Sequence, residues 1–120
     1  MKGANAERVT SEAAEAAVGR LREMSADLRG CALLDPDGQV LAATGDPDRW
    51  GAPAADLLAA ADEAGGESAG HVHVATEDGE AFAVREDELA MVAVTERFTL
   101  ASLVIFDMRA VLRDLARESG

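Results

Sequence analysis

Two histidines and one cysteine are the side chains of this 120-residue chain best suited to metal or nucleophilic chemistry. His71 and His73 are two residues apart, so in a strand both imidazoles lie on the same face. A metal ion needs a third ligand, and the residues expected on that face of the next strand, Phe82 and Val84, cannot supply one. Two interpretations remain, a metal-binding pair and an edge strand with amphipathic side chains at an interface, and we favour the second.

The other motifs do not form a catalytic or phosphate-binding set. Cys31 opens an apolar run and is expected to be a small buried residue rather than a reactive thiolate. The glycine-rich residues 65–70 follow a helix and precede a strand, the reverse of the order that places helix N–H groups on a phosphate. Asp35-Pro36-Asp37-Gly38 lacks the remaining ligands of a calcium loop and predicts a turn. We therefore expect no catalytic residue, no cofactor and no metal.

The charge balance argues against two classes of partner. The chain has 11 basic and 23 acidic residues, for a net charge of −12 at pH 7. A phosphate backbone and an anionic membrane both attract clustered Lys and Arg. We therefore expect neither a nucleic-acid partner nor a membrane partner. Because no apolar stretch is long enough for a secretory signal or a membrane span, a cytoplasmic protein is expected.

The first third of the chain predicts a helix followed by a β-hairpin. The helix is expected to begin at Thr10 or Ser11, which can cap its free N–H groups, and to end at a left-handed cap at Gly30. Two short strands, residues 31–34 and 39–44, are expected to flank the Asp-Pro-Asp-Gly turn.

The remainder predicts a helix, a three-stranded meander and a closing helix. In order, the expected elements are a helix over residues 53–64, strands over 71–76, 81–85 and 89–94, and a helix over 100–117. Asp78-Gly79 predicts a two-residue type I′ turn between the first two of these strands. Thr99 is the expected N-cap of the closing helix.

The resulting order, α-β-β-α-β-β-β-α, predicts an α/β (α+β) fold. It has one five-stranded, mostly antiparallel sheet with helices on both faces. Residues 1–10 show no periodicity and are expected to form a flexible arm, whereas residues 11–120 form a single domain.

Two surface features are candidate interaction sites. Arg109, Arg113 and Arg117 are spaced by four on the closing helix, next to Phe106. They predict either a docking stripe for an acidic surface or a favourable placement near a helix C-terminus, and we favour the second. Trp50 lies in a polar loop, where a tryptophan either anchors an interface or covers the edge of the core. Both interpretations of Trp50 remain open.

Residues 30–42 carry the most specific pattern in the chain, Gly-Cys-Ala-Leu-Leu-Asp-Pro-Asp-Gly-Gln-Val-Leu-Ala. A helix leads into a hairpin whose turn reads Asp-x-x-Gly before a Val-Leu strand. Together with the element order, this segment resembles the opening of the Roadblock/dynein light-chain family, over about residues 12–117. Longin-like and profilin-like domains share part of this architecture, so the turn motif carries most of the discrimination.

The resemblance implies a small, non-catalytic platform that homodimerises through its middle helix and third strand. Bacterial members of the family often partner a Ras-like small GTPase, as an activator or a scaffold. Two alternatives are a stand-alone sensor of a small ligand and an interaction module without a GTPase partner. The dimer face implied for this chain consists of Leu57, Leu58, Ala61, His71, Val72, His73 and Val74.

Overall fold

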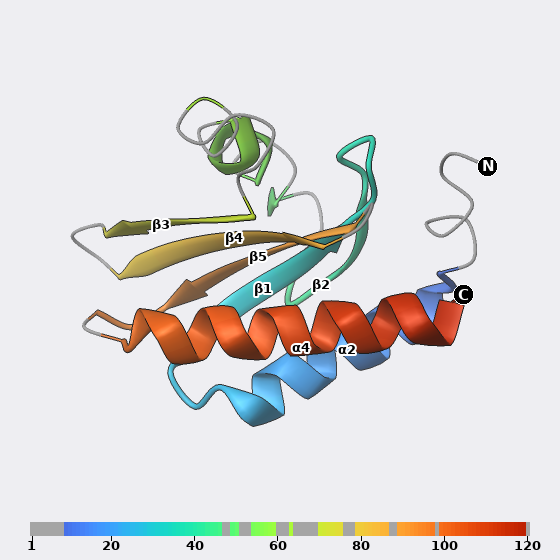
Figure 1. Cartoon of the computed structure of the whole chain (residues 1–120), viewed down its shortest axis with the longest axis horizontal. Helices are drawn as coiled ribbons and strands as arrows, with labels where there is room; N and C mark the ends of the chain where they lie inside the picture. The colour runs from blue at the N-terminus through green and yellow to red at the C-terminus, as the bar shows by residue number, and fades with distance from the viewer. Residues whose placement is uncertain are drawn as a thin grey trace.

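The computed structural model describes residues 9–46, 49–50, 54–59, 63, 70–75, 79–86, 89–97 and 99–119. The elements are α2 (Ser11–Met24), β1 (Leu28–Leu34), β2 (Val40–Ala43), β3 (His71–Ala75), β4 (Glu80–Glu86), β5 (Leu89–Thr95) and α4 (Ala101–Ser119) (Figure 1). Residues 54–59 are also helical and lie between β2 and β3 along the chain. The predicted order of elements is therefore confirmed.

The five strands form one antiparallel sheet in the order β2-β1-β5-β4-β3. The hairpin β1–β2 and the meander β3–β4–β5 each pair locally, and β1 then pairs with β5 in the middle of the sheet. This arrangement confirms the predicted sheet and leaves β3 and β2 at its two edges.

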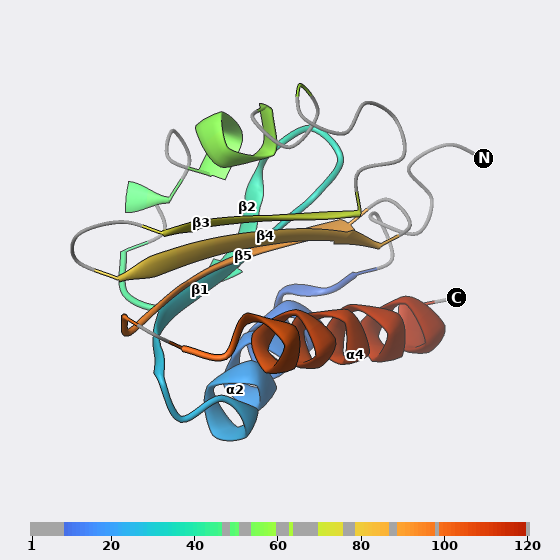
Figure 2. The ribbon, with the colours of Figure 1, turned by 60° about the vertical axis from the view of Figure 1, so that its left-hand side comes forward.

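Helices cover both faces of the sheet, as predicted. Figure 2 shows α2 and α4 packed on one face and the helical residues 54–59 over the other. The side chains of β1 alternate between these two layers: Cys31 and Leu33 lie in the core under α2 and α4, whereas Ala32 and Leu34 lie in the core under the helical segment. Because both faces are covered, β5 and the second half of β1 (Cys31–Leu34) are continuous apolar runs rather than alternating ones.

The first helix begins as predicted but ends earlier. The Thr10 Oγ1 accepts a hydrogen bond from the backbone N of Ala13 at 3.0 Å, so Thr10 is the N-cap. The helix ends at Met24, and Leu28 and Gly30 belong to β1, opposite Thr95 and Val94 of β5. The predicted cap at Gly30 is therefore wrong. Leu28 continues the apolar period of the helix in sequence, but its pairing with β5 places it in a strand, because tertiary contacts override local helix propensity. Of the expected arm over residues 1–10, only the last two residues are described, and Val9 lies in the core.

The turn of the first hairpin has the predicted form. The backbone N of Gly38 donates to the Asp35 carbonyl at 3.0 Å, and Gly38 has a φ of 87°. The Asp35 carboxylate also accepts hydrogen bonds from the backbone N of Asp37 and of Gln39, both at 2.9 Å. The Asp and Gly of the motif are thus both required by the geometry of the turn.

The second hairpin differs from its prediction. A two-residue turn at Asp78-Gly79 would place Ala75 opposite Phe82, whereas Ala75 lies opposite Glu80. Residues 76–78 lie outside the described residues, but this register contradicts a two-residue turn at Asp78-Gly79. Since the shift is an even number of positions, His71 and His73 still share a face with Val84 and Phe82.

Candidate interaction surface

Strand β3 is an open edge of the sheet. It pairs with β4 on one side, and in the part of the chain that the structure describes no strand pairs with the other side. The carbonyl of Gly70 accepts a hydrogen bond from the backbone N of Arg85 at 2.9 Å. Antiparallel ladders alternate, so the backbone groups of Gly70, Val72 and Val74 point toward β4, whereas those of His71, His73 and Ala75 point away from the sheet.

The sequence of β3 does not protect this edge. Natural edge strands usually carry Lys, Pro or a bulge that prevents pairing with another chain. His71–Ala75 has none of these residues, and its register with β4 is regular. The opposite edge strand β2 is only four residues long, and its pairing with β1 contains an irregularity. Of the two edge strands, β3 is therefore the better suited to pair with a strand of another chain.

One face of β3 carries the two histidines and faces the α4 side. The ring of His73 stacks on Phe82, with centroids 4.5 Å apart and an angle of 3° between the planes. His73 Nε2 also contacts the Glu80 carboxylate, whose other oxygen accepts a hydrogen bond from the backbone N of Thr99 at 2.8 Å. Glu80 is buried, and these two contacts satisfy its oxygens.

Glu80 is the residue of this face that sequence reasoning missed. Only Phe82 and Val84 were expected there, but the observed register brings a carboxylate at the start of β4 beside the histidines. The signal was its alternation with Phe82 and Val84, which places all three on one face. Thr99 was expected to cap α4; instead its hydroxyl donates to the carbonyl of Glu96 at 2.6 Å, and the helix begins at Ala101.

His71 and the arginines of α4 connect the same face to the helix. Arg109 Nη2 lies 3.0 Å from His71 Nδ1, so the guanidinium donates to a neutral imidazole. A side chain at Gly70 would meet this guanidinium, since a Cβ there would lie 2.8 Å from Arg109 Nη2. Arg113 Nε lies 3.4 Å from a carboxylate oxygen of Glu86 on β4. Arg109 and Arg113 therefore hold α4 against the β3–β4 end of the sheet.

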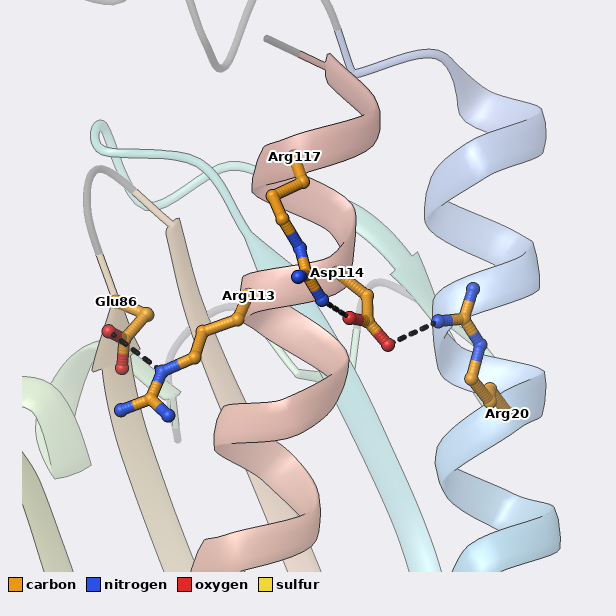
Figure 3. A network of polar contacts seen from close by, with 5 residues as sticks. All are labelled: Arg20, Glu86, Arg113, Asp114 and Arg117. Carbon is orange, nitrogen blue, oxygen red and sulfur yellow. Dashed lines mark hydrogen bonds and ion pairs between the residues drawn. The ribbon is translucent and has the colours of Figure 1, made fainter.

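Figure 3 shows the outer part of this network. Arg113 reaches toward Glu86, while Asp114 lies between Arg117 of the same helix and Arg20 of α2, 3.2 Å from Arg20 Nη1. The three arginines of the predicted stripe thus have partners within the chain. Each exposed pair contributes about 1 kcal/mol or less, so these contacts can exchange for others.

The opposite face of β3 borders an apolar hollow. Val74 lines it together with Leu57 and Trp50, and its volume is about 320 Å³. Val72 packs on the smaller core beneath the helical segment, and Leu58 is buried in that core. Ala61, the remaining residue of the expected dimer face, lies outside the described residues. The side chains that can meet a partner here are therefore Leu57, which is half-buried, and Val74, which is 39% exposed.

Trp50 covers the edge of the smaller core. Its indole N–H donates to the carbonyl of Thr44 at 3.1 Å, and its ring lies against Gly30, where a Cβ would be 3.1 Å from the ring. A second hollow of about 500 Å³, lined partly by Arg29 and Arg49, lies on the same tryptophan. Gly30 is therefore needed for the close approach of Trp50, and Trp50 lines both hollows.

The groups considered for catalysis or metal binding are not arranged for it. Cys31 is fully buried, and burial raises the pKa of its thiol to about 11, so the thiolate is scarce at neutral pH. Among the described residues, no group of three or more His, Cys, Asp or Glu side chains is placed to hold a metal ion. In the same part of the chain, no helix is both long and apolar enough to cross a membrane.

Comparison with solved protein structures identifies the fold. No family model and no curated protein sequence matches the chain. A Roadblock/LC7 domain from Streptomyces avermitilis superposes with a TM-score of 0.73 at 17% identity, covering 87% of this chain and 95% of that one. The chain adopts the Roadblock/LC7 fold. MglB of Myxococcus xanthus shares this fold with a TM-score of 0.72 at 14% identity, covering 90% of this chain and 88% of that chain.

A profilin is also similar in structure to this chain. Schizosaccharomyces pombe profilin matches with a TM-score of 0.63 at 14% identity, covering 88% of this chain and 98% of the profilin. The partial likeness to profilins that the sequence suggested is therefore present. The Roadblock/LC7 domains from Streptomyces avermitilis nevertheless superpose with higher TM-scores, 0.73 and 0.66.

Proposed function

We propose that this protein is a non-catalytic, homodimeric regulatory or scaffold protein that acts in the cytoplasm and binds a Ras-like small GTPase. The observation that carries the proposal is the open edge of β3 beside an apolar hollow. A backbone edge without Lys or Pro, next to half-exposed Leu57 and Val74, is suited to strand pairing combined with apolar contact.

Pairing of β3 with β3 of a second copy explains both faces of the strand. In a two-fold antiparallel pair, residues directly opposite one another lie on the same face of the sheet. His71 and His73 of both copies would then lie on the α4 side. Val72 and Val74 of both copies would lie on the other side, so the two apolar hollows would adjoin across the axis. The result would be a ten-stranded sheet with one shared apolar groove beneath the two helical segments.

The GTPase part of the proposal rests on the fold and on the hairpin motif. MglB has the same fold, and the sequence resembles the family whose bacterial members often partner such GTPases. A protein that supplies no reactive side chain regulates a partner by binding one of its states more tightly than the other. The groove side of the proposed dimer offers the apolar surface for such binding, and the acidic surface of the chain disfavours a nucleic-acid competitor.

The dimer is tested by a double substitution at its proposed face. Leu57→Glu with Val74→Glu places two like charges near the axis and is expected to halve the molar mass, from twice 12.5 kDa to 12.5 kDa, in light scattering after gel filtration. Ala55→Glu, an exposed position on the other side of the same helical segment, is the matched control and should leave the dimer intact. A wild-type monomer, or a double variant that stays dimeric, would remove this interface.

The GTPase partner is tested by capture with defined nucleotide states. The purified protein is presented with each small GTPase of its own organism, loaded with GDP or with a GTP analogue. Capture of one GTPase in one state, with at least tenfold less in the other, is the expected result. Capture in neither state would contradict the GTPase proposal. A melting shift with a small apolar ligand would then support the alternative of a ligand sensor that uses the 320 Å³ hollow.

A further inference from the structure

Two hollows of different chemistry adjoin at Trp50. The apolar hollow has a volume of about 320 Å³. The hollow that Arg29 and Arg49 line, here called the arginine hollow, has a volume of about 500 Å³. Trp50 and Val94 line both of them, so a ligand that fills the apolar hollow can extend into the arginine hollow past these two side chains.

The apolar hollow has the size and the lining of a small-ligand site. Ala81 of β4 and Val92 and Val94 of β5 line it, and Leu57 borders it from the helical segment. Its volume is at the lower end of the range of about 300–1,000 Å³ that small-molecule sites in proteins occupy. The charged residue of its lining, Asp56, is exposed. This hollow therefore suits a short alkyl chain rather than a polar ligand.

The arginine hollow supplies positive charge in a strongly acidic chain. The net charge is −12, yet Arg29 and Arg49 both line this hollow, together with one carboxylate, Asp46, among the described residues. Arg29 Nε also lies 3.5 Å from a carboxylate oxygen of Glu96. That pair is exposed, and a guanidinium has five N–H donors, so Arg29 can contact Glu96 and an anion together. Because the cations of the lining exceed its carboxylate by one charge, a monoanion fits better than a doubly charged phosphate.

We propose that the two hollows together bind a short fatty acid, with its alkyl chain in the apolar hollow and its carboxylate at Arg49 and Arg29. Guanidinium groups match the planar geometry of a carboxylate and donate charge-assisted hydrogen bonds to it. Asp56 lines the apolar hollow but not the arginine hollow, so it disfavours the reversed orientation. The site does not rest on the proposed dimer or on a GTPase, because all of these residues belong to one chain.

Trp50 reports occupancy of this site. It is the only tryptophan of the chain, and there is no tyrosine, so the fluorescence between 300 and 400 nm comes from its ring. The ring is half-buried, and an alkyl chain that displaces water from it shifts the emission to shorter wavelength. The test is a fluorescence titration of the full chain with octanoate, in parallel with hexanoate, octanol and acetate.

The four probes separate the contribution of the alkyl chain from that of the carboxylate. Octanoate should give a saturable shift to shorter wavelength and raise the melting temperature. Hexanoate should bind roughly tenfold more weakly, since it buries two methylene groups fewer. Octanol has the chain without the charge and should also bind at least tenfold more weakly than octanoate. Acetate, which has only the head group, should give no shift at the same concentrations.

Three substitutions locate the site. Arg49→Glu should weaken the binding of octanoate at least tenfold and leave that of octanol unchanged. Ala81→Leu fills part of the apolar hollow and should weaken the binding of both probes alike. Arg22→Glu is the matched control. It makes the same change of charge at an exposed position of α2, on the other face of the sheet, and should bind octanoate as the wild type does.

The outcomes that would overturn the site differ from those that concern the dimer. No saturable shift with octanoate up to roughly 10 mM, above the millimolar Kd of weak binding, would overturn it. Equal affinities for octanoate and octanol, or equal losses in Arg49→Glu and Arg22→Glu, would also overturn it, because the arginine hollow would then not bind the carboxylate. None of these readouts depends on the molar mass, so the site and the β3 pairing succeed or fail separately.

Discussion

Gly79→Ala is expected to lower the free energy of unfolding by about 3 kcal/mol and the melting temperature by roughly 10 °C. A Cβ at this position would lie 2.2 Å from the backbone carbonyl oxygen of Thr95. The obstacle is backbone in the last residue of β5, so no side chain can rotate away, and β4 and β5 would have to separate where Glu80 pairs with Thr95. Chemical denaturation of the variant and the wild type measures the difference.

The matched control is the same substitution at Gly19. This glycine lies within α2, and a Cβ there would meet no atom within 4 Å. Because glycine is a poor helix former, Gly19→Ala should raise the free energy of unfolding by about 0.5–1 kcal/mol. Equal effects of the two substitutions, in either direction, would show that the contact with Thr95 does not determine the role of Gly79.

Raising the pH from 8 to beyond 11 is expected to remove roughly 2–3 kcal/mol of stability through Cys31 alone. Burial raises the pKa of its thiol from 9.0 to about 11 in the folded chain. Between these two values the unfolded chain loses the thiol proton while the folded chain keeps it. The contribution of the buried thiol is therefore complete below pH 9 and is lost as the pH rises through about 11.

The composition of the chain allows the effect of Cys31 on stability to be measured with little contribution from other titrating side chains. There is no Tyr and only one Lys, Lys2, so few other groups change charge in this range. Cys31→Ala lowers stability at pH 8 by leaving a cavity, but it should remove the loss between pH 9 and 11. Unfolding free energies measured at several alkaline pH values give the slope for both proteins. An unchanged slope in the variant would assign the alkaline loss to another group.

The sequence predicted the order of elements, the sheet and the first hairpin because these depend on local chemistry. Asp35 and Gly38 specify their turn through hydrogen bonds within five residues, and apolar runs as dense as Leu89–Val94 favour a buried strand. The end of α2 was not predictable in this way. Leu28 continues the helical apolar period, and only its pairing with Thr95, far along the chain, assigns it to β1.

The sequence predicted that β3 forms part of the candidate surface, but it did not predict the side-chain contacts made there. The edge position of β3 follows from the hairpin-and-meander order, but the register between β3 and β4 does not, and that register brings Glu80 to His73. The role of Gly30 was also misjudged. A helix cap and a space for Trp50 both require glycine, and only the fold distinguishes them. Residues that act through distant neighbours therefore had to be found in the structure.

The pairing of β1 with β5 has a kinetic consequence. Ala32 lies opposite Val92, sixty residues away, whereas the hairpin and the meander join neighbours in sequence. Closing a loop of that length costs on the order of 4 kcal/mol of chain entropy. This cost falls on the first contacts between β1 and β5, before further pairing of the two strands can offset it. We expect the two halves to form early and to dock late. Until they dock, each half exposes an apolar face and an unpaired strand, so the period before docking is when the chain is most open to aggregation.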